Sequence, residues 1–346
     1  RYPVRKRGLV GTSVDLPLGG EGLWDLNAAL SADFFEQDID PRGPDGWDQP
    51  LETGQDYEKN WDRTGYGKVR LNRWLGESAQ LTAQADARYT NHRESLTVGG
   101  PIETYAQWLT ALVVQGEMQP GDHWILQAGL GWDHAATPES GDKPANDPEG
   151  APAVNLRALH RLSDVTRLYA AASRRSRFPS LRELYSGALG RFEPNPDLRP
   201  ERQDLFEIGL ATDHPTWRLE TAAFVNYLKD GIERVKYADN QFQRVNRTEI
   251  RVPGVEVVGH WYAARDLAVH LQYTVMAARV AEGGDYDLPA EDRPDYLSRV
   301  GVNWQRDTGP GTLLEAVVTG PRWSADASGA SAATDDLKRL PAGVTW

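Results

Sequence analysis

Cysteine is absent from this chain of 346 residues. Disulfide scaffolds, thiolate metal sites and cysteine nucleophiles are therefore excluded together. A basic surface is also missing, because the formal net charge is −12 and no block of Lys and Arg is longer than Arg5-Lys6-Arg7. Proteins that bind nucleic acid usually carry such a surface, so we expect no nucleic-acid partner. No apolar run approaches the roughly 18 residues of a membrane-spanning helix.

Recognisable catalytic motifs are missing as well. None of the seven His residues lies in an H-E-x-x-H motif or another metal-binding spacing, and no G-x-S-x-G elbow is present. We therefore expect no enzymatic activity and no cofactor. His92, His260 and His270 fall on polar faces of the segments described next, where hydrogen bonding is the expected role.

What the chain does contain is a regular alternation of apolar and polar residues. Between residues 79 and 92, nearly every odd position is apolar and every even position is polar. Successive side chains of a strand point to opposite faces, so this pattern predicts a strand with one apolar and one polar face. The same pattern recurs at 24–34, 124–132, 217–227, 267–275 and 296–304.

Aromatic residues bracket the apolar faces of several of these segments. The pairs are Trp24/Phe34, Trp124/Trp132, Trp217/Tyr227 and Tyr296/Trp304. At about 3.3 Å per residue and a tilt of about 45°, their spacing projects to roughly 19–23 Å, close to the ~25 Å apolar band of an outer-membrane barrel. A soluble β-sandwich or propeller is the alternative, but soluble strands average only about 5–6 residues.

Short and long connections also alternate along the chain. Short turns are predicted near 17–21, 75–78, 119–122, 162–164, 213–216, 264–266 and 306–311. Longer loops are predicted near 38–61, 94–102, 137–150, 179–201, 282–293 and 326–338, with a hairpin-like link at Asp239-Asn240. Bacterial barrels have short periplasmic turns and longer outer loops. The sequence thus predicts an all-β, antiparallel transmembrane β-barrel of fourteen strands and the start of a fifteenth, in the outer membrane.

Two motif blocks carry a resemblance to a known family. The segment Ser176-Arg177-Phe178-Pro179-Ser180-Leu181-Arg182-Glu183-Leu184-Tyr185 resembles the F-R-A-P-S-x-x-E-L-Y block of TonB-dependent outer-membrane receptors, although Ser176 and Phe178 stand where the family usually has Phe and Ala. Asn195-Pro196-Asp197-Leu198-Arg199-Pro200-Glu201 is similar to the family's N-P-x-L-x-P-E block, and Glu207-Ile208-Gly209 to the E-x-G that follows. Gly254-Val255-Glu256 is similar to a later G-V-E.

The resemblance implies a fold and a function. Barrels of this family have 22 strands, so residues 1–346 would form a partial barrel domain, about 14–15 strands, without the plug domain and the terminal strands. The implied function is uptake of a metal chelate, with a ferric siderophore first and cobalamin second. The implied partners are the plug inside the barrel, the TonB complex acting through it, the chelate, and outer-membrane lipid and lipopolysaccharide.

Two other functions remain as alternatives. A passive porin is the runner-up, but the N-P-D-L-R-P-E block disfavours it. An outer-membrane hydrolase would need a nucleophile and a base, which the sequence does not reveal. No His lies between Phe178 and Glu201, where the haem-uptake branch of the family typically has one, and this disfavours haem as the substrate.

Several residues are candidates for ligand binding. Trp47, Tyr57 and Trp61 would stack on a flat ligand. Arg174, Arg175, Arg177 and Arg182 lie near the outer rim, where they would meet an anionic ferric chelate or pair with the acidic loops. Asp285 and Asp287 have a spacing that suits Ca²⁺, but a solvated or lipopolysaccharide-facing acidic loop is the simpler interpretation.

The sequence also predicts what lies close to Gly209. Glu207 and Gly209 are expected to face the lumen, where glycine permits close approach of another backbone. In the family, that backbone would belong to the plug.

Overall fold

A computed structural model describes residues 4–19, 23–40, 58–97, 99–187, 192–238, 241–247, 249–282, 285–290, 293–325, 337–340 and 343–345. Fourteen long strands and a three-residue fifteenth form one antiparallel wall, in which each strand pairs with the next along the chain. The strands are β1 (Val4–Leu18), β2 (Trp24–Ile39), β3 (Glu58–Trp74), β4 (Ala79–Ser95), β5 (Glu103–Met118), β6 (Trp124–Ser140), β7 (Glu149–Arg161), β8 (Thr166–Arg177), β10 (Glu201–His214), β11 (Trp217–Lys229), β14 (Ile250–Ala264), β15 (Leu267–Met276), β18 (Tyr296–Trp304), β19 (Thr312–Thr319) and β22 (Gly343–Thr345). The predicted fold class and strand number are confirmed.

The remaining elements belong to the long connections. They are α1 (Leu181–Tyr185), β9 (Phe192–Glu193), β12 (Gly231–Ala238), β13 (Gln241–Arg247), β16 (Arg279–Glu282), β17 (Asp285–Pro289), β20 (Arg322–Ala325) and β21 (Leu337–Leu340). The strands β12 and β13 form a hairpin on either side of Asp239-Asn240, as predicted, and β9 joins it. In the described residues no helix is long and apolar enough to cross a membrane.

Part of one predicted loop is folded as a hairpin. The sequence predicts a loop at 282–293, whereas β16 and β17 pair with each other and β16 also pairs with β14. Ala278 and Val280 pack against Ile250 and Leu228, which lie on neighbouring strands. Burial of these apolar side chains extends the strands beyond the predicted boundary.

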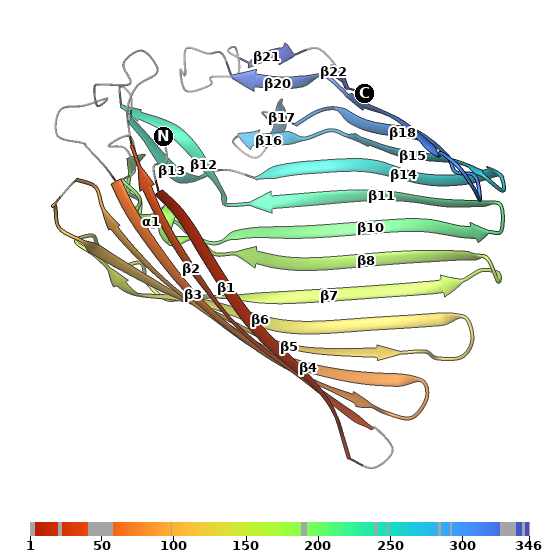
Figure 1. The fold of residues 1–346 in the computed structure, drawn as a ribbon, viewed down its shortest axis with the longest axis horizontal. Helices are drawn as coiled ribbons and strands as arrows, with labels where there is room; N and C mark the ends of the chain where they lie inside the picture. The colour runs from red at the N-terminus through yellow and green to blue at the C-terminus, as the bar shows by residue number, and fades with distance from the viewer. Residues whose placement is uncertain are drawn as a thin grey trace.

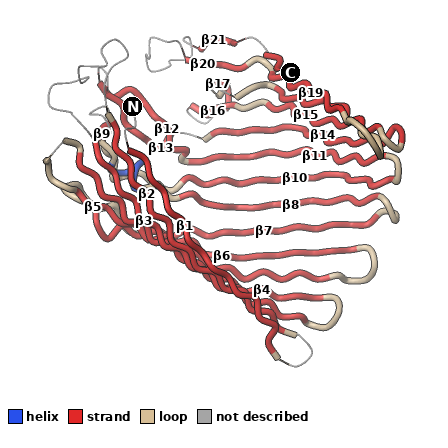
Figure 2. The backbone as a smooth tube through the Cα atoms, in the orientation of Figure 1, coloured by secondary structure: helices blue, strands red, loops and turns tan. Residues whose placement is uncertain are grey.

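The wall curves into an open trough (Figure 1). Short turns gather at one end of the strands, while α1 and the long connections lie at the other end, which we call the outer rim (Figure 2). Among the described residues, β1 pairs only with β2 and β22 only with β19, so the sheet does not close on itself. The helix α1 lies at the outer rim and packs against Tyr105 of β5.

The two faces of the wall differ as the alternation predicts. Leu30, Leu112 and Leu130 lie on the convex outer face and are 65%, 61% and 68% exposed. On the inner face, the Arg70 guanidinium donates hydrogen bonds of 3.0 and 2.9 Å to the Gln84 side chain. Apolar side chains therefore face the position of lipid, which cannot satisfy polar groups.

The close neighbour of Gly209 among the described residues is a side chain of the wall and not the predicted backbone. A Cβ atom at this position would lie 2.4 Å from Cζ of Tyr169, the residue paired with Gly209 across the strands. The Tyr169 side chain extends across the glycine, and its hydroxyl donates a 3.0 Å hydrogen bond to Glu220. The missing side chain thus makes room for an aromatic ring of the wall itself, and no second backbone is required.

Candidate ligand-binding site

A pocket of about 650 Å³ lies on the inner face near the outer rim. Its wall consists mainly of polar side chains from β1 to β5, with Phe35 and Leu109 among them, and residues between 177 and 186 close it on the other side. It therefore combines side chains that are far apart in the sequence. Its geometry depends on how α1 is attached to the wall.

The first motif block forms α1 and its N-cap. The Ser180 hydroxyl accepts a hydrogen bond from the Glu183 N–H, and the Glu183 carboxylate accepts one of 2.9 Å from the Ser180 N–H. This capping box satisfies two backbone donors that the helix end would otherwise leave unpaired. The helix was not predicted from the sequence, although the S-x-x-E spacing was the signal for it.

Apolar motif residues attach this helix to the wall. Leu184 and Tyr185 are 0% and 1% exposed, and they pack with Leu181, Leu198 and Tyr105 of β5. The ring centroids of Tyr105 and Tyr185 lie 5.3 Å apart. Leu198 comes from the second motif block, so the two blocks meet in one small core beside the pocket.

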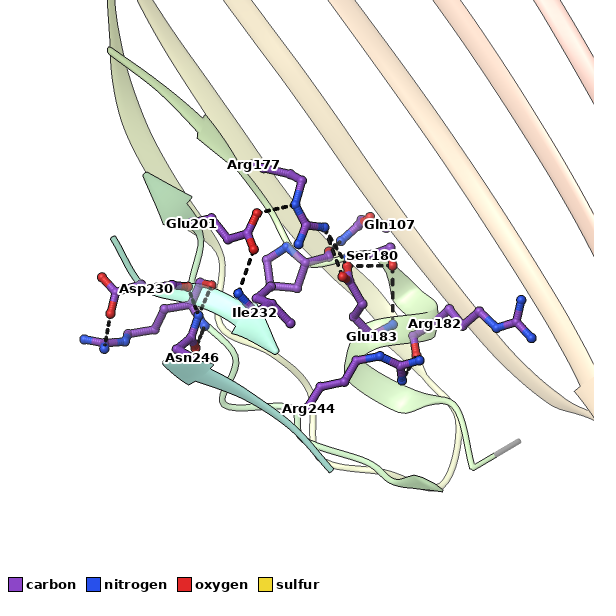
Figure 3. A network of polar contacts seen from close by, with 12 residues as sticks. Gln107, Arg177, Ser180, Arg182, Glu183, Glu201, Asp230, Ile232, Arg244 and Asn246 are labelled. Carbon is purple, nitrogen blue, oxygen red and sulfur yellow. Dashed lines mark hydrogen bonds and ion pairs between the residues drawn. The ribbon is translucent and has the colours of Figure 1, made fainter. Parts of the chain in front are cut away.

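Arg177 connects α1 to the strands (Figure 3). Its guanidinium donates a 2.5 Å hydrogen bond to Glu201 and one of 2.8 Å to Glu183. Glu201 also accepts a 2.6 Å hydrogen bond from the Ile232 N–H of β12. The hydrogen bond to Glu201 is the main cause that raises the pKa of Arg177. Burial opposes ionisation of Glu183, but its hydrogen bonds with Arg177 and Ser180 outweigh burial and lower the pKa of Glu183.

Hydrogen bonds from side-chain amides to backbone carbonyls hold other parts of the two motif blocks in place. The Gln107 amide donates a 2.8 Å hydrogen bond to the carbonyl of Pro179. Asn195 donates through its side chain to the carbonyl of Arg244 at 2.8 Å, and the Asn146 side chain donates to the carbonyl of Pro196 at 2.7 Å. The motif blocks are thus mainly structural, because they fix where the outer connections lie.

The four candidate arginines do not form one cluster. Arg174 lies on the outer face of β8 and pairs with Asp204, at 2.6 Å between Nε and the carboxylate. Arg175 lies on the opposite, inner face of the same strand. Arg177 is occupied by Glu183 and Glu201, so it positions α1. Arg182 is exposed and lines the pocket.

Of the aromatic and acidic candidates, only Trp61 has a side chain among those that the structure describes. Trp47 and Tyr57 fall outside the described residues, as do the side chains of Asp285 and Asp287 in β17. Trp61 belongs to β3, where its neighbour Asp62 lines the pocket, so alternation directs Trp61 to the outer face. There its ring lies 6.0 Å from the Arg93 guanidinium. These ligand and calcium roles stay predictions.

His92 is the centre of a polar cluster in the pocket. The ring packs against Tyr105 at a centroid distance of 6.0 Å, while Nδ1 lies 2.6 Å from Asp62 and Nε2 3.5 Å from Glu94. The outward pair Tyr89 and Trp108, with ring centroids 4.8 Å apart, marks the top of the apolar band. His92 lies three residues beyond Tyr89, above that band.

Two neighbouring carboxylates determine the charge of His92. Burial lowers its pKa, but the hydrogen bonds and charges of Asp62 and Glu94 outweigh burial and raise the pKa to about 9. The imidazolium form therefore prevails at neutral pH. The hydrogen-bonding role predicted for His92 is confirmed.

The pocket carries charges of both signs, and its lining includes the carboxylate of Glu58, which accepts a 3.0 Å hydrogen bond from Asn60. Arg7 neutralises Asp33 through contacts of 3.1 and 2.5 Å, and His92 neutralises part of the Asp62 and Glu94 pair. Within the described residues, Arg5, Arg88 and Arg182 line the same pocket and form no ion pair. Three guanidinium groups from β1, β4 and α1 thus remain available to an anionic ligand.

Comparison with known proteins identifies the family. Residues 4–346 match the family described as TonB dependent receptor-like, beta-barrel. The chain belongs to this family. Its wall is therefore part of an outer-membrane barrel of a Gram-negative bacterium, and the localisation and family inferred from the motif blocks are confirmed.

Solved structures show the same fold as this receptor barrel. The copper transporter OprC superposes with a TM-score of 0.80 at 16% identity, covering 98% of this chain and 55% of that one. The siderophore receptor PirA from Acinetobacter baumannii gives 0.77 at 14% identity, covering 99% and 55%. The ferric enterobactin receptor PfeA from Pseudomonas aeruginosa gives 0.73 at 18% identity, covering 98% and 53%. The receptor barrel described here thus spans about half the length of these proteins.

Proposed function

We propose that this protein takes up an anionic metal chelate across the outer membrane, with a ferric siderophore as the leading substrate class. The observation that carries the proposal is the group of three arginines, Arg5, Arg88 and Arg182, that line one inner pocket without ion pairs among the described residues. The siderophore and ferric enterobactin receptors among the structural relatives support the same substrate class.

Rigid attachment of α1 favours selective binding. Arg182 lies on a helix whose N-terminal turn is held by the capping box and by the Arg177–Glu183 pair. A ligand would therefore meet a guanidinium group on a backbone that is already in place, which reduces the ordering cost of binding. Each hydrogen bond to a charged group contributes about 1.5–3 kcal/mol, so three such groups distinguish a charged chelate from a neutral one.

Transport would require partners outside this chain. We propose that a plug domain occupies the trough against the polar inner face, and that the TonB complex acts on the plug to open a path. The polar inner face supports this proposal, since it carries groups such as Arg70 and Gln84 that suit a hydrated or protein-filled lumen. Cobalamin is the second candidate substrate class.

Binding by arginine variants of the native receptor tests the substrate class. Arg88→Ala and Arg182→Ala should each weaken binding of an anionic ferric tris-catecholate by about tenfold or more, the equivalent of one lost charge-assisted hydrogen bond. Binding of a neutral ferric tris-hydroxamate should change little. Arg93→Ala is the matched control, because Arg93 lies on the outer face of the same strand as Arg88. Equal losses for both chelates, or none, would refute the anionic substrate class.

Energy dependence tests the mode of transport. Uptake of radioactive iron by cells that express the receptor should stop when TonB is deleted or when the inner-membrane proton gradient is collapsed. Uptake that continues under both conditions would indicate a passive pore, and the receptor mechanism would then have to be abandoned.

A further inference from the structure

Strand pairing places two histidines directly opposite each other. His260 of β14 is paired with His270 of β15, and their ring centroids lie 6.5 Å apart with 35° between the ring planes. Their chain neighbours Trp261 and Leu271 are 57% and 37% exposed on the outer face, so alternation directs both imidazoles to the inner face. A search for sequence motifs misses this pair, because only the turn between β14 and β15 brings the two side chains to the same height.

The pair belongs to a polar row that continues across β18 and β19. His270 is paired with Gly301, and Gly301 with Glu315. A Cβ atom on Gly301 would overlap the ring of His270, so the imidazole lies over the glycine. Its Nε2 thereby comes within 3.3 Å of one carboxylate oxygen of Glu315. The other oxygen of that carboxylate lies 3.3 Å from Nη1 of Arg299, which fixes the position of Glu315.

Glu315 determines which nitrogen of His270 is free. The carboxylate accepts a hydrogen bond from Nε2–H, so Nδ1 of the neutral ring keeps its lone pair. Histidines that bind a metal ion commonly donate their other N–H group to a carboxylate in this way. That hydrogen bond holds the ring in one orientation and makes the coordinating nitrogen more basic. His270 therefore has the support that a metal-binding imidazole requires.

His260 is free to turn toward the same ion. Its side chain is exposed, and among the described residues its ring forms no hydrogen bond or ion pair. Residues directly opposite on antiparallel strands have Cβ atoms about 4.5–5.5 Å apart, so rotation about the side-chain bonds brings both rings within reach of one ion. Arg218, the neighbour of His260 on β11, is engaged elsewhere, because its Nε lies 3.6 Å from Asp213.

We propose that His260 and His270 together bind one divalent transition-metal ion on the inner face of the wall. The two imidazoles are the protein ligands, and Glu315 is a positioning residue that acts through His270. Among the described residues no group of three His, Asp or Glu side chains is placed to hold an ion, so water completes the coordination. Imidazole suits Cu²⁺, Ni²⁺ and Zn²⁺, whereas Ca²⁺ and Mg²⁺ prefer oxygen ligands.

This metal site is separate from the proposed chelate pocket. The pair lies close to the short turn that follows Ala264 and precedes Leu267, whereas the pocket lies near the outer rim. Short turns of outer-membrane barrels face the periplasm. The ion would therefore bind at the periplasmic end of the wall, and the proposal does not depend on which substrate the receptor transports.

Titration of the native receptor with Cu²⁺ tests the site. The receptor is purified without a histidine tag, and electron paramagnetic resonance reports the nitrogen ligands of the bound ion. His260→Gln and His270→Gln each remove one ligand. His214→Gln is the matched control, because His214 also lies near a short turn but its ring packs on Trp217, 5.6 Å away between centroids.

The native receptor and the His214→Gln control should each bind one Cu²⁺ with the signature of two nitrogen ligands. Both pair variants should lose that signature, and the double variant should bind no more weakly than either single variant. Glu315→Ala should keep the signature but weaken binding about tenfold or more.

His260→Gln decides the outcome, because an exposed side chain without hydrogen bonds can be replaced without unfolding the wall. An unchanged two-nitrogen signal in this variant, or no bound Cu²⁺ in the native receptor, would overturn the site. Displacement of Cu²⁺ by Zn²⁺ or Ni²⁺ in excess supports the proposed class of ion. Displacement by an equal concentration of Ca²⁺ would overturn it, because it would indicate oxygen ligands.

Discussion

At the scale of single residues, glycine makes room for aromatic rings across the wall. Gly209 is paired with Tyr169, Gly254 with Phe224, and Gly301 with His270. In each pair, a Cβ atom on the glycine would lie within 2.4 Å of the ring. The ring lies across the neighbouring strand at these points, which a larger residue would prevent.

Gly209→Ala should therefore destabilise the barrel by about 1–3 kcal/mol, the usual cost of overpacking. Gly116→Ala is the control, because a Cβ atom on Gly116 would have no neighbour within 4 Å. Unfolding of the two variants in lipid vesicles would be compared. The double variant Gly209→Ala/Tyr169→Ala should be less destabilised than the sum of the two single changes. Strict additivity would contradict the proposed clash.

His92 should make stability depend on pH. Its folded-state pKa of about 9 lies above the unfolded value of 6.5, so the protonated ring stabilises the fold. The contribution is complete below about pH 6.5, is lost as the pH rises toward 9, and amounts to an order of 3 kcal/mol. The melting temperature of the native receptor should fall between pH 6 and pH 9.5.

The variant His92→Gln tests the origin of that pH dependence. It keeps a polar side chain but cannot carry the charge, so its melting temperature should change much less over the same interval. An identical fall in both proteins would assign the pH dependence to other groups.

At the scale of one element, β10 shows what the alternation of faces means energetically. Ile208 is 54% exposed on the outer face, while Glu207 is on the inner face. Ile208→Arg should cost about 2–4 kcal/mol, because it places a charge in the apolar band. Glu207→Arg introduces the same side chain one residue away and should cost much less, because the lumen is polar. Refolding into lipid vesicles measures both, and equal costs would contradict the assigned faces.

At the scale of the whole molecule, the wall is an open trough. Within the described residues, β1 and β22 each pair on one side only, and unpaired backbone groups in lipid cost several kcal/mol each. Residues 1–346 expressed alone should therefore neither transport a chelate nor form a uniform pore. Planar-bilayer recordings should show no discrete conductance steps. Steps of one reproducible size would mean that the fifteen strands close by themselves.

Much of the fold could be predicted from the sequence because the relevant forces act locally. Lipid requires apolar side chains on one face of every strand. This requirement makes apolar and polar residues alternate within each segment. The alternation at 79–92 and the two motif blocks thus sufficed to predict the wall and the family. The same period separates Arg174 from Arg175 and Arg177, so their opposite faces were already implied once the limits of β8 were known.

The tertiary structure alone decided which side chains meet. Arg5, Arg88 and Arg182 come from β1, β4 and the α1 connection, and no local pattern relates them. The assignment of Arg177 to Glu183 and Glu201 depends on how α1 folds back onto Tyr105 and Leu198. Contacts of this kind arise from burial and charge pairing between distant segments, so they become visible only when the strands are assembled side by side.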